Sequence, residues 1–410
     1  MIKVLISGGG TGGHIFPAVS IANEIRQKQP DAQILFVGAE GRMEMQRVPQ
    51  AGYEIKGLPI RGLIRPLWSP KNIGVMLDFL KSKRMAKQII REFQPDVAVG
   101  VGGYASSATL QAAASMGIPC LVQEQNSYAG VTNKSLAKKA QCICVAYEGM
   151  ERFFPADRLI LTGNPVRQNL VEAAQKAAQR AAATSEAQQT ATGEAQQAAA
   201  TSEAQQAAGS LGSPEARTAL GLKADVPTLL SIGGSLGART INESVLSHLD
   251  LIKQSPIQVL WQTGKYYSAE IAHRLADYAE EGEVCGCPDN LHVTDFVSDM
   301  ANAYAAADLV VSRAGASSIS ELCLLGKASI LVPSPNVAED HQTKNARALA
   351  DKNAAHLVTD AEAREKLMPL AVKLLGAPEE LRSLATEVKK LAKPNAASDI
   401  ADEVIKLVNR

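Results

Sequence analysis

The chain has 410 residues with 42 basic and 42 acidic side chains, so its formal net charge is zero. Its composition, 46% hydrophobic and 20% charged, is that of a globular protein of two or three domains, which excludes a small disulfide-stapled scaffold, a disordered chain and a fibrous repeat. The charges are unevenly divided, because residues 1–163 hold 19 basic and 12 acidic side chains and the rest hold 23 and 30. We therefore expect a basic first part and an acidic second part.

No apolar run approaches the roughly 20 residues of a membrane span, and the N-terminal MIKVLISGGG lacks the regions of a secretion signal. The six cysteines include C-x-C pairs rather than C-x-x-C pairs and are interpreted as reduced thiols. These features predict a cytoplasmic protein.

The first part of the chain alternates short apolar runs with helical stretches. Strands are predicted at residues 2–7, 33–38, 97–103, 118–125 and 140–147. Alternation of this kind is typical of βαβ units on a parallel sheet. This first domain is expected to end near residue 163.

A second βαβ series follows, with strands predicted at residues 228–232, 257–264, 290–297, 308–315 and 328–335. The stretch 395–410 is predicted to be an amphipathic helix, because Ile400, Val404 and Val408 recur at helical spacing. The fold class is therefore α/β, with two doubly wound domains.

Between the two series, residues 172–213 contain 16 Ala and 8 Gln, and the segment TSEAQQ at residue 184 recurs unchanged at 201 and as TGEAQQ at 192. This low-complexity segment is predicted to be a surface insertion, either disordered or a marginal helix, because it has too little apolar surface to form a core.

Glycine-rich turns follow several of the predicted strands. GGGTGGH (residues 8–14), GVGGYAS (100–106) and GGSLGAR (233–239) each stand between a strand and a helix. Glycines there let the backbone approach a ligand, and the helix N-terminus offers unpaired N–H groups to an anion. Gly8, Gly10 and Gly13 also fit the dinucleotide pattern G-x-G-x-x-G, with Glu40 as a loose candidate for its acidic residue.

His14 closes the first of these turns. One interpretation is a histidine that caps or packs against the start of the helix. The other is a general base, because imidazole titrates near neutral pH and can take a proton from a hydroxyl nucleophile. The spacing alone leaves both interpretations open.

The second domain has its densest polar motif at SRAGASSISE, residues 312–321. Ser317 and Ser318 would add hydroxyl donors to the free N–H groups of a helix start. Together these groups would form a diphosphate-binding site that requires no metal. Glu321 is one turn farther along, where it could accept hydrogen bonds from a ribose; alternatively, it completes a capping box. A loop after the next predicted strand runs to DHQTKN, residues 340–345.

Residues 61–91 hold eight basic side chains and one acidic one among apolar residues such as Trp68 and Leu77. This pattern fits a solvated helix over a core, or a surface for anionic lipid in which basic groups meet headgroups. Nucleic acid is not the expected partner, because no RNA- or DNA-binding motif accompanies the charge.

Seven segments resemble the MurG family of the GT-B glycosyltransferase superfamily: GGGTGGH, GVGGYAS, EQN-x-x-AG-x-TN, GNPVR, GGS-x-GAR, RAGASSISE and DHQ-x-x-NA. The resemblance implies two Rossmann-like domains facing across a cleft. Residues 1–163 with 395–410 would receive lipid I and associate peripherally with the cytoplasmic membrane, and residues 164–394 would bind UDP-GlcNAc. Residues 172–213 would be an insertion.

The resemblance also implies an inverting transfer of GlcNAc from UDP-GlcNAc to the C4 hydroxyl of lipid I, giving lipid II for peptidoglycan, without a metal or another cofactor. His14 would be the base, and Tyr104 and Glu124 would lie on the acceptor side. The donor would contact Thr11, Gly12, Gly13, Asn126, Arg167, Ser235, Val297, Ala316, Ser317, Ser318, Ile319, Ser320, Glu321 and Gln342.

Two alternatives belong to other classes of protein. The Gly8, Gly10 and Gly13 pattern is compatible with an NAD-dependent oxidoreductase. Residues 61–91 alone would be compatible with a non-catalytic module that binds membranes or nucleic acid.

Overall fold

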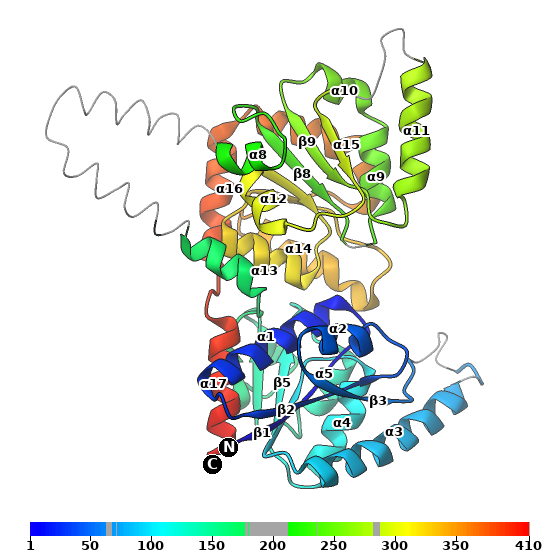
Figure 1. Cartoon of the computed structure of the whole chain (residues 1–410), viewed down its shortest axis with the longest axis vertical. Helices are drawn as coiled ribbons and strands as arrows, with labels where there is room; N and C mark the ends of the chain where they lie inside the picture. The colour runs from blue at the N-terminus through cyan, green and yellow to red at the C-terminus, as the bar shows by residue number, and fades with distance from the viewer. Residues whose placement is uncertain are drawn as a thin grey trace, which may run out of the picture. The chain divides into compact units, whose positions relative to one another are not determined.

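The computed structural model describes residues 1–62, 68–70, 72–176, 179, 212–234, 236–281 and 288–409 (Figure 1). They form two compact units, Met1–Gln168 with Lys393–Arg410, and Asn169–Ala392. Each unit is built on one parallel sheet, and the expected α/β class with two doubly wound domains is confirmed. The division between the units falls a few residues from the expected positions 163 and 395, and most of the 172–213 segment lies outside the described residues.

The first unit has a seven-stranded sheet in the order β3-β2-β1-β4-β5-β6-β7. Its strands are β1 (Lys3–Ser7), β2 (Gln33–Ala39), β3 (Glu54–Leu58), β4 (Val97–Gly100), β5 (Cys120–Glu124), β6 (Cys142–Val145) and β7 (Leu159–Leu161). The strand order reverses between β1 and β4, and ligands of open α/β sheets bind at the carboxyl ends of strands beside such a reversal. Both of these strands end in a glycine-rich turn.

Six α-helices cover the described part of this sheet: α1 (Gly12–Lys28), α2 (Glu44–Gln50), α3 (Asn72–Phe93), α4 (Tyr104–Ser115), α5 (Val131–Leu136) and α17 (Ala396–Val408). Short 3₁₀ turns follow at η1 (Met150–Arg152) and η2 (Ala156–Arg158). The last helix, α17, lies beside α1 although they are far apart in sequence (Figure 1). Ile400 and Val404 are fully buried in a core shared with Ile21 and Ile25, and Lys28 pairs with Asp402 at 2.6 Å.

The second unit has a six-stranded sheet in the order β10-β9-β8-β11-β12-β13. Its strands are β8 (Thr228–Ile232), β9 (Gln258–Gln262), β10 (Leu291–Thr294), β11 (Leu309–Ser312), β12 (Ser329–Leu331) and β13 (His356–Leu357). Its helices are α8 (Pro214–Ala219), α9 (Arg239–Leu246), α10 (Leu249–Gln254), α11 (Ser268–Glu281), α12 (Met300–Ala306), α13 (Ala316–Leu325), α14 (His341–Ala350), α15 (Asp360–Leu375) and α16 (Pro378–Lys390), with a 3₁₀ turn η3 (Ala338–Asp340). The order reverses between β8 and β11, and both strands again end in glycine-containing turns.

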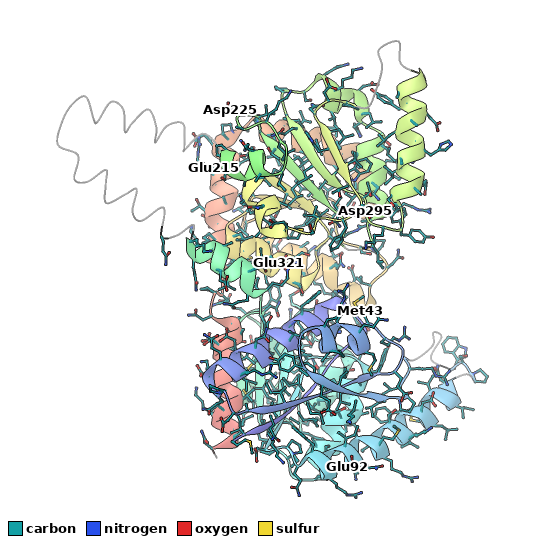
Figure 2. All side chains as sticks on the ribbon, in the orientation of Figure 1. Met43, Glu92, Glu215, Asp225, Asp295 and Glu321 are labelled. Carbon is teal, nitrogen blue, oxygen red and sulfur yellow. The ribbon has the colours of Figure 1, made fainter. Side chains whose placement is uncertain are left out.

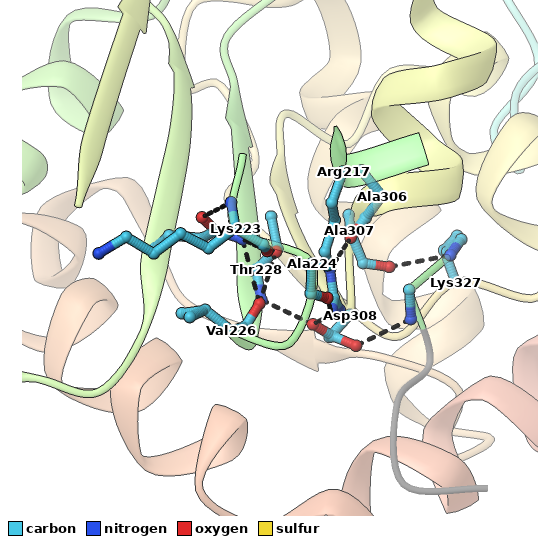
Figure 3. A network of polar contacts seen from close by, with 11 residues as sticks. Arg217, Lys223, Ala224, Val226, Thr228, Ala306, Ala307, Asp308 and Lys327 are labelled. Atoms are coloured by element: carbon cyan, nitrogen blue, oxygen red, sulfur yellow. Dashed lines mark hydrogen bonds and ion pairs between the residues drawn. The ribbon is translucent and has the colours of Figure 1, made fainter. Parts of the chain in front are cut away.

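A buried ionic network fixes the opposite, amino edge of this second sheet (Figure 3). The guanidinium of Arg217 donates to Asp308 at 2.5 Å and to the carbonyls of Ala224 and Ala306. The Asp308 carboxylate also accepts from the backbone N–H groups of Gly212 and Thr228. Arg217 and Asp308 therefore hold the start of α8 against β8 and β11.

Within the described part of the chain, no helix is long and apolar enough to cross a membrane.

Candidate functional site

In the first unit, the glycine-rich turns after β1 and β4 are in contact. A Cβ on Gly102 would lie 2.8 Å from Nε2 of His14, and one on Gly103 would lie 2.6 Å from the Gly9 carbonyl oxygen. Both Gly102 and Gly103 have positive φ, +103° and +87°, which other residues rarely adopt. Because Gly102 and Gly103 have no side chains, the second turn can pack against Gly9 of the first turn and leaves space for the His14 ring.

The imidazole of His14 is held by the turn that precedes it. Nδ1 is 3.0 Å from the Gly9 carbonyl oxygen and 3.4 Å from the Thr11 hydroxyl. Because a carbonyl oxygen accepts but does not donate, the contact with Gly9 requires the proton on Nδ1. The neutral ring then has its basic lone pair on Nε2. Thr11 is the N-cap of α1, and Gly12 and Gly13 are its first residues, so the helix begins inside the segment that was predicted from the sequence to be a turn.

The carboxyl end of β5 carries a connected set of polar side chains. Glu124 is buried, and its carboxylate accepts from the backbone N–H and side-chain amide of Asn126 and from Gly130 and Asn133. Asn164 donates to the Gln125 carbonyl and accepts from Gln123, both at 2.9 Å. Glu124 therefore orients Asn126 by hydrogen bonds and is itself buried rather than exposed at the surface.

Two further predicted residues lie on this unit. Tyr104 is 52% exposed in spite of being aromatic, and its ring lies against Gly62, where a Cβ would come within 2.6 Å of it. Arg167 is half-buried and belongs to the first unit, whereas the sequence analysis placed it in the donor range 164–394.

In the second unit, the predicted diphosphate-binding site lies at the N-terminus of α13. Ser317 and Ser318 are half-buried in its first turn. Ile319 points into the core, and the hydroxyl of Ser320 donates to the Ala316 carbonyl at 2.9 Å. The helix start can therefore offer backbone N–H groups and the hydroxyls of Ser317 and Ser318 to an anion.

Glu321 lies farther along α13 (Figure 2) and is buried. The hydroxyl of the fully buried Tyr304, from α12, donates to its Oε2 at 3.0 Å. This contact fixes the carboxylate. Glu321 belongs to a motif visible in the sequence, whereas no sequence signal marks Tyr304.

Gln262, at the end of β9, connects two loops of the same edge. Its Oε1 accepts from the Val297 N–H at 3.1 Å, and its Nε2 donates to the Gly234 carbonyl at 2.8 Å. Val297 is one of the predicted residues, and Ser235, which follows Gly234, lies outside the described residues. Gln262 was missed, although its place at the carboxyl end of a predicted strand marks it as a candidate.

The loop after β12 is held from two sides. Gln342 accepts from the Ser334 N–H at 2.9 Å. Arg313 donates to the Pro333 carbonyl and pairs with Asp360 at 2.5 Å. Glu339 and Asp340, just before α14, both have positive φ, and such strained backbone is concentrated at functional sites.

Residues 4–145 match the model of the glycosyltransferase family 28 N-terminal domain, and residues 228–404 match that of its C-terminal domain. A protein of Bacteroides fragilis, named UDP-N-acetylglucosamine--N-acetylmuramyl-(pentapeptide) pyrophosphoryl-undecaprenol N-acetylglucosamine transferase, is 54% identical over 100% of this chain and 96% of its own length. A protein of the same name from Cytophaga hutchinsonii is 48% identical over 99% of this chain and 97% of its own length.

Among solved structures, MurG of Acinetobacter baumannii superposes with a TM-score of 0.70 at 26% identity, covering 99% of this chain and 100% of that one. A UDP-GlcNAc 2-epimerase from Neisseria meningitidis, at 16% identity and a TM-score of 0.60, shares the fold over 99% of this chain and 100% of its own. The family assignment replaces the interpretation of the first glycine-rich turn as part of an NAD-dependent oxidoreductase. The chain belongs to glycosyltransferase family 28 and, within it, to the MurG proteins.

Proposed function

We propose that this protein transfers N-acetylglucosamine from UDP-GlcNAc to the C4 hydroxyl of lipid I, undecaprenyl-pyrophosphoryl-MurNAc-pentapeptide, and so forms lipid II for peptidoglycan synthesis. The observation that carries the proposal is the full-length identity of 54% to a relative named for this reaction. The glycine-rich turns at both strand-order reversals, with His14 in one unit and Glu321 in the other, supply the groups that such a transfer requires.

The second unit, in this proposal, binds the donor. The N-terminus of α13, with Ser317 and Ser318, receives the diphosphate, because its N–H groups and hydroxyls stabilise negative charge as UDP departs. Glu321 accepts hydrogen bonds from the ribose. Val297 contacts the uracil through its backbone, and Gln342 reaches the sugar.

The first unit, in this proposal, supplies the base. Nε2 of His14 takes the proton of the C4 hydroxyl while that oxygen attacks C1 of the GlcNAc. The bond between C1 and the diphosphate oxygen breaks, UDP leaves with the electron pair, and the configuration at C1 inverts. Asn126, oriented by Glu124, contacts the donor sugar, and Thr11, Gly12, Gly13 and Arg167 complete the donor contacts.

The test is a transfer assay with UDP-GlcNAc and a lipid I analogue. His14→Ala should lower kcat by about 10²-fold or more, the usual contribution of a general base, with donor affinity little changed. The matched control is His273→Ala, because His273 is an exposed histidine on α11. Absence of disaccharide product from the wild-type protein would refute the function, and a wild-type rate for His14→Ala would refute the base assignment alone.

The protein is also proposed to associate peripherally with the cytoplasmic face of the membrane through residues 61–91. On α3, Val75, Phe79, Ala86 and Ile90 face the core, whereas the apolar side chains of Ile73, Met76, Leu77 and Leu80 are exposed. Arg84 and Arg91 are exposed farther along the same face of the helix, with the half-buried Lys87 between them. Such a face, apolar and then basic, suits a surface of anionic lipid. Residues 63–67 and 71 lie outside the described residues.

A further inference from the structure

Glu44 is a carboxylate buried at 0% exposure directly beneath the first glycine-rich turn. It is the first residue of α2, next to Met43, which Figure 2 labels. Its Oε1 accepts from the N–H of Ala39, at the end of β2, at 3.1 Å. Its Oε2 accepts from the N–H of Gly10 at 3.0 Å. A Cβ on Gly9 would lie 2.1 Å from Oε1, so the turn can approach the carboxylate only because this residue is glycine.

The two bonds at Gly9 and Gly10 belong to a single peptide unit. Its N–H, from Gly10, donates to Glu44, and its carbonyl, from Gly9, accepts from Nδ1 of His14 at 3.0 Å. A peptide group is planar and conjugated, so a negative charge at its N–H increases the electron density on its carbonyl oxygen. The Glu44 carboxylate is thus connected to the imidazole through one amide plane.

We propose that Glu44 is a positioning residue for catalysis that acts on His14 through the Gly9–Gly10 peptide. The carboxylate fixes this peptide plane, and the polarised carbonyl keeps the proton of the neutral imidazole on Nδ1. Nε2 is then the nitrogen that accepts the proton of the attacking hydroxyl. When the imidazolium forms, the same carbonyl stabilises its positive charge. This inference rests on the proposed role of His14 as the base, and it assigns to Glu44 no contact with substrate.

The first experiment is a double-mutant cycle with Glu44→Gln and His14→Ala in the transfer assay. The glutamine has nearly the same shape, but it loses the charge and can no longer accept from both N–H groups. In the wild-type background, Glu44→Gln should lower kcat about tenfold or more, with the KM for UDP-GlcNAc changed less than about twofold. In the His14→Ala background, the same substitution should change kcat less than about twofold, because the group through which it acts is gone.

The matched control is Glu54→Gln, which removes an exposed carboxylate of the same unit that pairs only with Lys56 among its described contacts. It should leave kcat unchanged. A Glu44→Gln enzyme with the wild-type rate, or one whose loss is equally large without His14, would overturn the proposal. If instead His14→Ala itself turns over at the wild-type rate, then the base assignment fails, and the relay fails with it.

The second experiment measures the wild-type protein and does not depend on any Glu44 variant. Long-range ¹⁵N–¹H NMR spectra of the wild-type protein with labelled histidine, with the His14 signals identified by their loss in His14→Ala, report which ring nitrogen carries the proton. The expected result is protonation on Nδ1 above the titration range of the ring. A ring protonated mainly on Nε2 would overturn the proposal even if His14 proves to be the base.

Discussion

At the scale of the residue, Lys327 shows how burial in the interior of the second unit shifts the pKa of a charged side chain. Its ammonium donates to the Ala307 carbonyl at 2.8 Å in the network of Figure 3. The pKa of Lys327 is lowered to about 8, mainly because the ammonium is buried. The Asp308 carboxylate opposes this shift, and the Arg217 guanidinium adds to it. Between pH 8 and the ordinary pKa of 10.5, the unfolded chain therefore binds more protons than the folded one. The stability of the unit should rise with pH across this window.

The prediction is that the free energy of unfolding of wild-type protein gains up to roughly 3 kcal/mol over this range, relative to Lys327→Met. Urea unfolding at several pH values measures the difference. Lys253→Met, at an exposed site on α10, is the matched control. Equal pH slopes for wild type and Lys327→Met would contradict the shifted pKa.

The motif residues could be predicted from the sequence, but their partners could not. Glycine-containing turns after predicted strands indicate where His14 and Ser317 lie, because turn chemistry is local. Glu44 and Tyr304 reach the site only through tertiary folding, and nothing in GRMEMQ or NAYAAA distinguishes them from ordinary helix residues. A buried carboxylate is recognised by its partners, which become known only with the fold.

At the scale of the element, α3 is unusual because its outer face carries both exposed apolar side chains and basic side chains. Neutralising Arg84, Lys87 and Arg91 together should weaken binding to anionic phosphatidylglycerol vesicles by roughly 100-fold, since each basic group contributes about 1 kcal/mol at such a surface. Co-sedimentation with vesicles of increasing phosphatidylglycerol content measures the effect, which should fade at high salt. The control replaces three exposed lysines of the second unit, Lys253, Lys366 and Lys373, with the same change in net charge. Equal vesicle binding by the two triple variants would show that α3 is not the contact.

Buried strands were easier to predict from the sequence than half-exposed or very short ones. Central strands such as β1, β4, β8 and β11 are buried along their length and appear in the sequence as apolar runs. The edge strands β3, β7 and β13 were not predicted. β3 is half-exposed and includes Glu54 and Lys56, and β7 and β13 have three and two residues, too few for a periodic pattern.

At the scale of the whole molecule, the first unit is completed by the last helix of the chain. Because α17 buries Ile400 and Val404 against α1, this unit needs residues that follow the entire second unit in sequence. Ile400→Ala should therefore destabilise the first unit by roughly 2–5 kcal/mol through the cavity it leaves, without changing the affinity of the second unit for UDP.

Calorimetry with and without UDP separates the two effects. At about 100 times its Kd, UDP should stabilise the unit that binds it by roughly 2.7 kcal/mol and thereby identify its transition. Ile400→Ala should lower the other transition, whereas Ile405→Ala, at a less buried position of the same helix, should lower it less. If Ile400→Ala lowers the UDP-sensitive transition instead, then α17 stabilises the donor-binding unit, and the core that it shares with α1 is not what holds the first unit together.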